Sequence, residues 1–230
     1  MTPELTIRTF TNDQYTLDKV FYANFYRLKG FKKEDPNRPV VLDLGAHAGY
    51  FSFAALSLGA KKIYAFEPMT DNFRILFKNL HSTQIAPAEL FPFGVYTTST
   101  RLWLDVPDYK DSYYDWAEIQ VNGNSSKRIP VQCLTLDDIL TNFIREDVGL
   151  LKINLGYAEA EILKASQELG KKVANICGEV GVALNATQEF QAMLAAKGYE
   201  EILFFPVPER EDKSMFIASK TKCADMFITN

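Results

Sequence analysis

The sequence predicts an α/β fold in which a mostly parallel sheet carries helices on both faces. Two short apolar runs, residues 40–44 and 60–66, are each followed by a stretch with helical spacing. Alternating strand and helix segments of this kind build parallel sheets through crossover helices. The chain has 230 residues, of which 47% are hydrophobic, so it can bury one substantial core. We therefore expect one compact unit, with an appendage over residues 1–38 and the main domain over 39–230.

The appendage is predicted to contain an edge strand over Leu5–Phe10 and a helix over Tyr15–Leu28. Polar residues 11–13 offer caps for that helix, and Gly30 follows its end. A helix in front of the first strand can pack across the open end of the sheet. Its aromatic side chains then either line a substrate mouth or pack into the core.

Composition argues against several classes of partner. A net charge of −4 and a pI near 5.3 leave no broad basic face, so we expect no binding to nucleic acid or to anionic membranes. No segment has the length and apolarity of a membrane span or a signal core. The three cysteines are far apart and odd in number, which predicts reduced thiols in the cytoplasm. No group of side chains has metal-ligand spacing, so no metal is expected.

A glycine turn follows the first predicted strand, Val40–Leu44. Gly45 and Gly49 are four residues apart, and a helix is predicted from Tyr50. The next strand ends at Glu67, where an acidic side chain can accept hydrogen bonds from ribose hydroxyls. Together these features predict a nucleotide site. The alternative is a structural turn whose glycines only permit tight packing.

The turn departs from the dinucleotide fingerprint, because His47 stands where the second glycine of that pattern would be. A ligand with ribose but no phosphate needs fewer backbone amides at this turn. Asp-x-Gly-x-x-x-Gly followed by an acid resembles the class I methyltransferases, which bind S-adenosylmethionine. More narrowly, residues 42–52 and 64–68 resemble the FkbM-type methyltransferases, which transfer methyl groups to hydroxyls, commonly of sugars and natural products.

This resemblance implies a Rossmann-like sheet of seven strands, mostly parallel, with an antiparallel last strand. The predicted strands 200–205 and 214–219, which follow a helix over 187–197, fit that final pair. The cofactor would be S-adenosylmethionine. The residues that the resemblance assigns to it are Asp43, Gly45, Ala46, His47, Gly49, Tyr50, Glu67, Pro68, Gly94 and Val95. Gly94 and Val95 end a third predicted strand, 89–95, in the neighbourhood of the adenine ring.

Residues 107–127 crowd aromatic and acidic side chains together. Aromatic rings cover the apolar faces of sugars while carboxylates accept from their hydroxyls, so Tyr113, Tyr114 and Trp116 are candidates for acceptor binding. A surface loop stabilised by its own aromatic residues is an equal alternative.

The segment 149–163 resembles a family motif but departs from it at Asn154, Gly156 and Tyr157. Asn154 replaces an aspartate and cannot take a proton, although its amide can orient a hydroxyl. Glu159 and Glu179, which ends a predicted strand over 173–178, remain as candidate bases. Lys152 lies within a central strand, and we expect it to pair with Glu179 beneath the acceptor site.

Three of these residues also have a structural interpretation. Glu159 can interact with a helix N-terminus, Lys152 can extend past a sheet edge, and Glu179 can be a buried structural acid. His47 is expected to contact the methionine part of the cofactor or the backbone.

The leading prediction is an S-adenosylmethionine-dependent methyltransferase that acts on a hydroxyl of a small molecule or glycan. The replacements at Asn154 and Gly156 support a second interpretation, a cofactor-binding but catalytically idle partner or regulatory module. A nicotinamide oxidoreductase comes third, since the glycine spacing and the absence of room for a separate substrate domain disfavour it.

Overall fold

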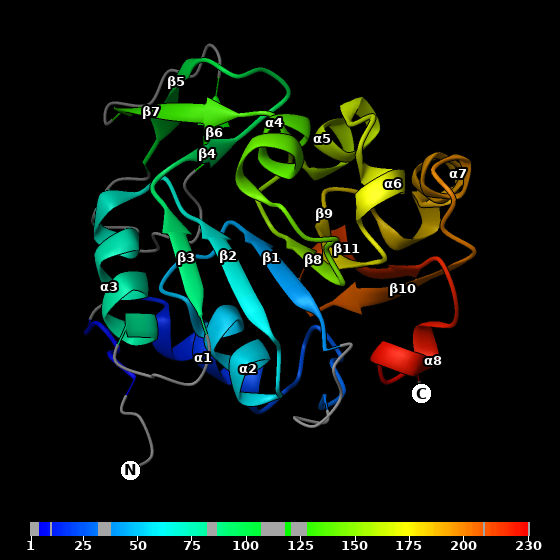
Figure 1. Ribbon diagram of the computed structural model, residues 1–230, viewed down its shortest axis with the longest axis horizontal. Helices are drawn as coiled ribbons and strands as arrows, with labels where there is room; N and C mark the ends of the chain where they lie inside the picture. The colour runs from blue at the N-terminus through cyan, green and yellow to red at the C-terminus, as the bar shows by residue number, and fades with distance from the viewer. Residues whose placement is uncertain are drawn as a thin grey trace.

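The predicted α/β fold with a seven-stranded sheet is confirmed by the computed structural model (Figure 1). The structure describes residues 5–9, 11–31, 38–81, 87–106, 118–120, 128–208 and 210–229. The strands of the large sheet lie in the order β10-β11-β9-β8-β1-β2-β3. Their bounds are β1 Val40–Leu44, β2 Lys62–Phe66, β3 Ala88–Phe91, β8 Leu150–Ile153, β9 Asn175–Val180, β10 Glu201–Val207 and β11 Arg210–Ser219. Only β11 runs antiparallel to its neighbours, β9 and β10, as the resemblance implies.

Two hydrophobic cores cover the two faces of this sheet. On one face the strands pack against α1 (Asp13–Phe21), α2 (Tyr50–Ser57), α3 (Thr70–His81) and α8 (Cys223–Met226). On the other they pack against α4 (Leu136–Asp138), the π-helix Ile139–Phe143, α5 (Glu159–Ala165), α6 (Leu169–Lys172) and α7 (Gln188–Ala196). All of β1 is buried because it lies between two parallel neighbours with helices on both sides.

A second, four-stranded sheet of order β4-β7-β5-β6 lies beyond one end of the large sheet, at the top of Figure 1. Its strands are β4 (Gly94–Val95), β5 (Arg101–Asp105), β6 (Glu118–Gln120) and β7 (Arg128–Leu134). The single strand predicted over 89–95 is therefore wrong. Its first part is β3, and its last two residues pair with β7 instead. Pro92 lies between the two parts, and its missing N–H cannot continue a ladder.

The appendage differs from both of its predicted elements. Residues 5–9 form no strand, because side chains satisfy their backbone: the Thr6 N–H donates to Asn79 (2.8 Å) and the Arg8 N–H to Asp13 (2.8 Å). The helix predicted to reach Leu28 ends at Phe21. Asn24 then adopts a left-handed conformation (φ 44°), and its side-chain amide bonds both the N–H and the C=O of Leu28. These bonds compete with further helical turns.

The ends of two strands also differ from the predicted ones. Glu179 lies inside β9, which continues to Val180, and β10 continues through Pro206 and Val207, beyond the predicted end at residue 205. Proline is tolerated there because β10 is an edge strand. Among the helices that the structure describes, none combines the length and the apolar character needed to cross a bilayer.

Candidate functional site

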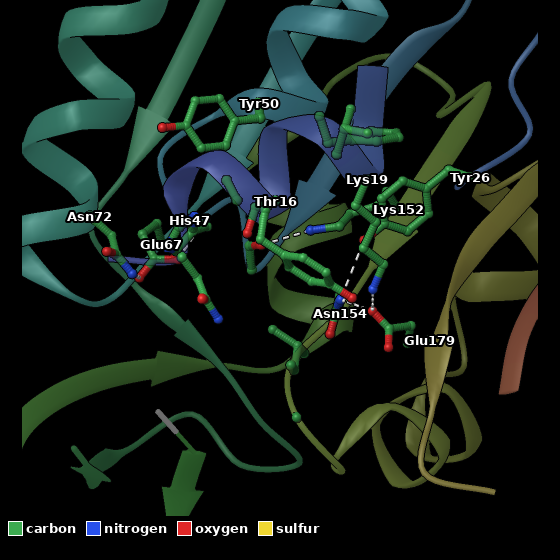
Figure 2. A pocket seen from close by; sticks show the side chains of 18 of the residues that line it. Thr16, Lys19, Tyr26, His47, Tyr50, Glu67, Asn72, Lys152, Asn154 and Glu179 are labelled. Atoms are coloured by element: carbon green, nitrogen blue, oxygen red, sulfur yellow. Dashed lines mark hydrogen bonds and ion pairs between the residues drawn. The ribbon is translucent and has the colours of Figure 1, made fainter. Parts of the chain in front are cut away.

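A cavity of about 220 Å³ lies at the carboxyl ends of β1, β2, β8 and β9, with α1 on its outer side. Figure 2 shows two groups of side chains facing each other across it. His47, Glu67 and Asn72 lie on one side, which we call the Glu67 end. Lys19, Tyr26, Asn154 and Glu179 lie on the other, which we call the Glu179 end. Ligands of open parallel sheets bind at this edge, so the cavity is the candidate active site.

In the turn after β1, backbone N–H groups donate hydrogen bonds to other atoms of the protein. The N–H groups of Gly45 and Ala46 both donate to Phe66 O (3.0 Å each), and that of His47 donates to the Glu67 carboxylate (2.8 Å). The Gly49 N–H donates to Ala46 O (2.9 Å). A pyrophosphate needs such amides for its own oxygens. The occupied amides therefore suit a ligand that brings ribose without phosphate to this turn.

Gly45 and Gly49 are required by backbone conformation and by packing. Both have positive φ, +74° and +85°. A Cβ on Gly45 would lie 2.0 Å from Asn154 O, and one on Gly49 would lie 2.7 Å from the Leu76 side chain. The glycines thus make room for protein atoms, which is the packing role considered for them above. Gly45 couples the turn directly to the end of β8.

Glu67 presents a buried carboxylate to the cavity. One oxygen accepts from the Met69 N–H (2.9 Å) and from Asn72 (3.3 Å), and the other accepts from the His47 N–H (2.8 Å). Burial raises the pKa of Glu67 despite these donors and nearby His47. A carboxylate has about four lone-pair sites, so one remains for a ligand hydroxyl. This geometry fits the ribose role predicted for Glu67.

The predicted pairing of Lys152 with Glu179 is wrong, because Lys152 pairs with Asp43. The Lys152 ammonium lies 3.0 Å from the Asp43 carboxylate and donates to Gly45 O (2.7 Å). Strand register is the cause: Asp43 on β1 lies directly beside Lys152 on β8. The Ser52 hydroxyl donates to the other Asp43 oxygen (2.6 Å). Asp43 is fully buried and supports the turn from beneath without lining the cavity.

Glu179 instead belongs to a group held by the appendage. One of its oxygens accepts from Lys19 of α1 (2.6 Å) and from the Asn154 amide (2.7 Å). That amide also lies 3.3 Å from the Tyr26 hydroxyl, and burial raises the pKa of this phenol well above its usual value. Glu179 and Asn154 therefore meet inside the cavity, and the cation beside them is Lys19 (Figure 2).

Glu159 does not line the cavity. Glu159 is the first residue of α5, its carboxylate accepts from the Leu155 N–H in the segment before this helix, and burial raises its pKa. The contact fixes the segment after β8, which is a structural role other than the interaction with a helix N-terminus considered above. Gly94 and Val95 are buried in β4 and also lie outside the cavity lining, so their contact with adenine stays a prediction. Tyr113, Tyr114 and Trp116 lie outside the described residues.

A charged group beside the turn was not predicted. Arg8 binds Asp13 through Nε (2.9 Å) and Nη2 (2.7 Å), and His47 Nε2 lies 3.8 Å from the same carboxylate. Burial of Asp13 raises its pKa, but the hydrogen bonds from Arg8 and the charge of His47 outweigh this and lower it overall. His47 thus contacts the appendage, and its side chain also lines the cavity.

Sequence reasoning also missed Lys19, Asn72, Arg210 and Lys213, which all line the cavity. No local motif marks these residues, since they come from two helices and from β11. Tyr26 was considered as part of a substrate mouth, and it does line the cavity. Within the described part of the chain, no cluster of three or more His, Cys, Asp or Glu side chains could hold a metal ion.

Comparisons with known proteins agree with this geometry. Residues 43–201 match the model of the family described as Methyltransferase FkbM domain. In structure the chain is similar to the human methyltransferase 10 domain containing protein (TM-score 0.56, 14% identity, covering 96% of this chain and 89% of that one). It is also similar to precorrin-6y C5,15-methyltransferase from Geobacter metallireducens GS-15 (TM-score 0.50, 14% identity, 96% of each chain). At these identities the likeness shows the fold alone. The sequence matches none of the curated proteins.

Proposed function

Because the chain belongs to the FkbM methyltransferase domain family, we propose that it transfers a methyl group from S-adenosylmethionine to a hydroxyl of a small molecule or glycan. The observation that carries the proposal is the contact of Glu179 with Asn154 (2.7 Å) in the cavity that also holds Glu67. The cavity thus offers a carboxylate for ribose at one end and a carboxylate for an acceptor hydroxyl at the other.

The cofactor would be held at the Glu67 end. Glu67 keeps one lone-pair site for a ribose hydroxyl, and the amides of Gly45, Ala46 and His47 are bonded within the protein. This arrangement supports S-adenosylmethionine over a nicotinamide dinucleotide, because these three amides are already bonded and cannot all serve a pyrophosphate. When bound, S-adenosylmethionine supplies a methyl carbon on a positively charged sulfur.

The Glu179 end would align the acceptor and take its proton. Lys19 and Asn154 hold one Glu179 oxygen, Oε1, which leaves Oε2 to accept the hydroxyl proton as the oxygen bonds to the methyl carbon and the carbon–sulfur bond breaks. The Asn154 amide donates to Glu179, so its carbonyl oxygen can position the acceptor hydroxyl. Tyr26 and Phe51 exclude water from the same end. The motif aspartate replaced by Asn154 is thus compensated by a carboxylate on the next strand.

Cofactor choice is tested by thermal unfolding with S-adenosylmethionine, S-adenosylhomocysteine and NAD in parallel. A ligand that binds only the native state, present at one hundred times its Kd, adds about 2.7 kcal/mol of stability. We expect stabilisation by the first two compounds. Stabilisation by NAD alone would overturn the proposal.

Acceptor chemistry is tested with Glu179→Gln and a panel of hydroxylated small molecules and glycans. Loss of a general base lowers turnover by about 10²–10⁴-fold, and we expect this for Glu179→Gln while S-adenosylhomocysteine still binds. Glu189→Gln, on the exposed side of α7, is the matched control and keeps full turnover. A Glu179→Gln enzyme with wild-type turnover would exclude Glu179 as the base.

A further inference from the structure

Lys213 on β11 is a buried lysine at the Glu179 end of the cavity. It is 7% exposed and lines the cavity. Its ammonium donates to Gly156 O (2.8 Å) and lies 4.3 Å from the centre of the Tyr157 ring. Met215 lies opposite Glu179 in the β9–β11 pair, so Lys213 is two residues along β11 from that position. Lys213 and Glu179 both line the cavity.

The other cations of the cavity each have a carboxylate partner. Lys19 pairs with Glu179 (2.6 Å), Lys152 with Asp43 (3.0 Å) and Arg210 with Asp212 (3.0 Å). Lys213 forms no ion pair with any carboxylate in the part of the chain that the structure describes. The Lys213 ammonium also attracts the Glu159 carboxylate, but these two groups are farther apart than the 4.0 Å limit of an ion pair.

A buried ammonium without a counter-ion is costly, and its cost is offset when a ligand supplies the negative charge. An ammonium has three N–H donors, and the Gly156 carbonyl takes one of them. The remaining donors lie at the end of the cavity where the acceptor would bind.

We infer that the acceptor is an acidic hydroxylated compound whose carboxylate or phosphate binds Lys213 while its hydroxyl faces Glu179. The inference rests on the proposed function, since it names the class of acceptor for that site. The Coulomb attraction of Lys213 would select acids over neutral analogues and place the reacting hydroxyl beside the base.

Inorganic phosphate and acetate test this charge requirement without assuming an acceptor scaffold. Their binding is measured by ligand-detected NMR on protein saturated with S-adenosylhomocysteine, at constant ionic strength because salt screens charged contacts. We expect at least one anion to bind the wild type, and the stronger of the two identifies the acidic group. Lys213→Gln, which keeps a donor for Gly156 O but loses the charge, should weaken binding by at least about tenfold.

Two variants control the experiment. Lys213→Arg keeps the positive charge and should retain anion binding, and Lys164→Met, at an exposed position of α5, should leave it unchanged. The inference is overturned if neither anion binds wild-type protein that holds S-adenosylhomocysteine, or if Lys213→Gln binds them as tightly as the wild type does. Displacement of the anion by S-adenosylhomocysteine would also overturn it, because the site would then belong to the cofactor. Failure of S-adenosylhomocysteine itself to bind would instead contradict the proposed function.

Discussion

At the scale of single residues, charges in this protein are placed where the β-sheet register brings a partner. Asp43 and Lys152 are both nearly inaccessible, at 0% and 4% exposure, in central strands that are otherwise apolar. Their contact supports the Gly45 turn from beneath, because Lys152 also donates to Gly45 O. The Asp43–Lys152 pair therefore links the stability of the sheet core to the geometry of the glycine turn.

Breaking this pair leaves an uncompensated buried charge. We expect Asp43→Asn to lower the free energy of unfolding by about 3–5 kcal/mol, measured by urea denaturation. The double variant Asp43→Leu/Lys152→Met should cost less than Asp43→Asn, because it removes both charges. Asp147→Asn, at an exposed position, should change the stability by less than about 0.5 kcal/mol. Equal costs for Asp43→Asn and Asp147→Asn would contradict a structural ion pair.

Glu159 makes stability depend on pH in a defined direction. Burial raises its pKa in the folded protein, so its contribution to stability is fully present below the unfolded pKa and is lost as pH rises through the folded value. Glu159→Gln can keep the bond from the Leu155 N–H without the charge. We expect its stability relative to the wild type to increase from pH 4 to pH 8, by about 1.4 kcal/mol for each tenfold difference in proton affinity.

Urea denaturation across that pH range measures the difference. Glu161→Gln, on the exposed side of the same helix, should show no such trend. A Glu159→Gln protein that loses relative stability as pH rises would contradict this assignment.

At the scale of elements, the appendage completes the candidate site. It brings Lys19 to Glu179 and Tyr26 to Asn154, and Arg8 and Asp13 lie beside His47. The chain changes direction between α1 and Tyr26 at Asn24, whose φ is 44°. Arg27, the residue after Tyr26, is also left-handed (φ 56°), so placement of Tyr26 in the cavity depends on two left-handed residues and on the two hydrogen bonds between Asn24 and Leu28.

Two substitutions at Asn24 separate backbone conformation from hydrogen bonding. Alanine loses both bonds and carries a left-handed cost of about 1–2 kcal/mol, whereas glycine loses the bonds alone. We expect Asn24→Ala to be less stable than Asn24→Gly by about 1 kcal/mol in urea denaturation. Equal stability of the two variants would show that the left-handed turn contributes little.

At the scale of the whole molecule, the two faces of the large sheet differ in the side chains that they carry. The face covered by α1, α2 and α3 carries Asp43, Lys152 and Glu179, so these three charged side chains project toward one core. The face covered by α4 to α7 is apolar and supports the strands from behind. We therefore expect ligand binding to affect mainly the elements on the side of the sheet that α1, α2 and α3 cover.

Hydrogen–deuterium exchange with and without S-adenosylhomocysteine measures this asymmetry. We expect slower amide exchange over residues 45–49, 66–69 and α1 when the ligand is bound, because binding suppresses the local opening of these segments. Exchange in α7 and β10, which lie away from the cavity, should not change. Protection centred on α7 or β10 would place the cofactor elsewhere.

The sheet, the glycine turn and the positions of Glu67 and Asn154 at strand ends beside the cavity can be derived from the sequence, because they depend on local spacing: apolar runs, paired glycines and polar residues at strand ends. The partners of Lys152 and Glu179 cannot. Asp43 reaches Lys152 through strand register, and Lys19 reaches Glu179 because α1 lies along the cavity. Burial and distance between remote segments set these contacts, so only the tertiary structure decides which carboxylate pairs with Lys152 and which pairs with Lys19 at the cavity.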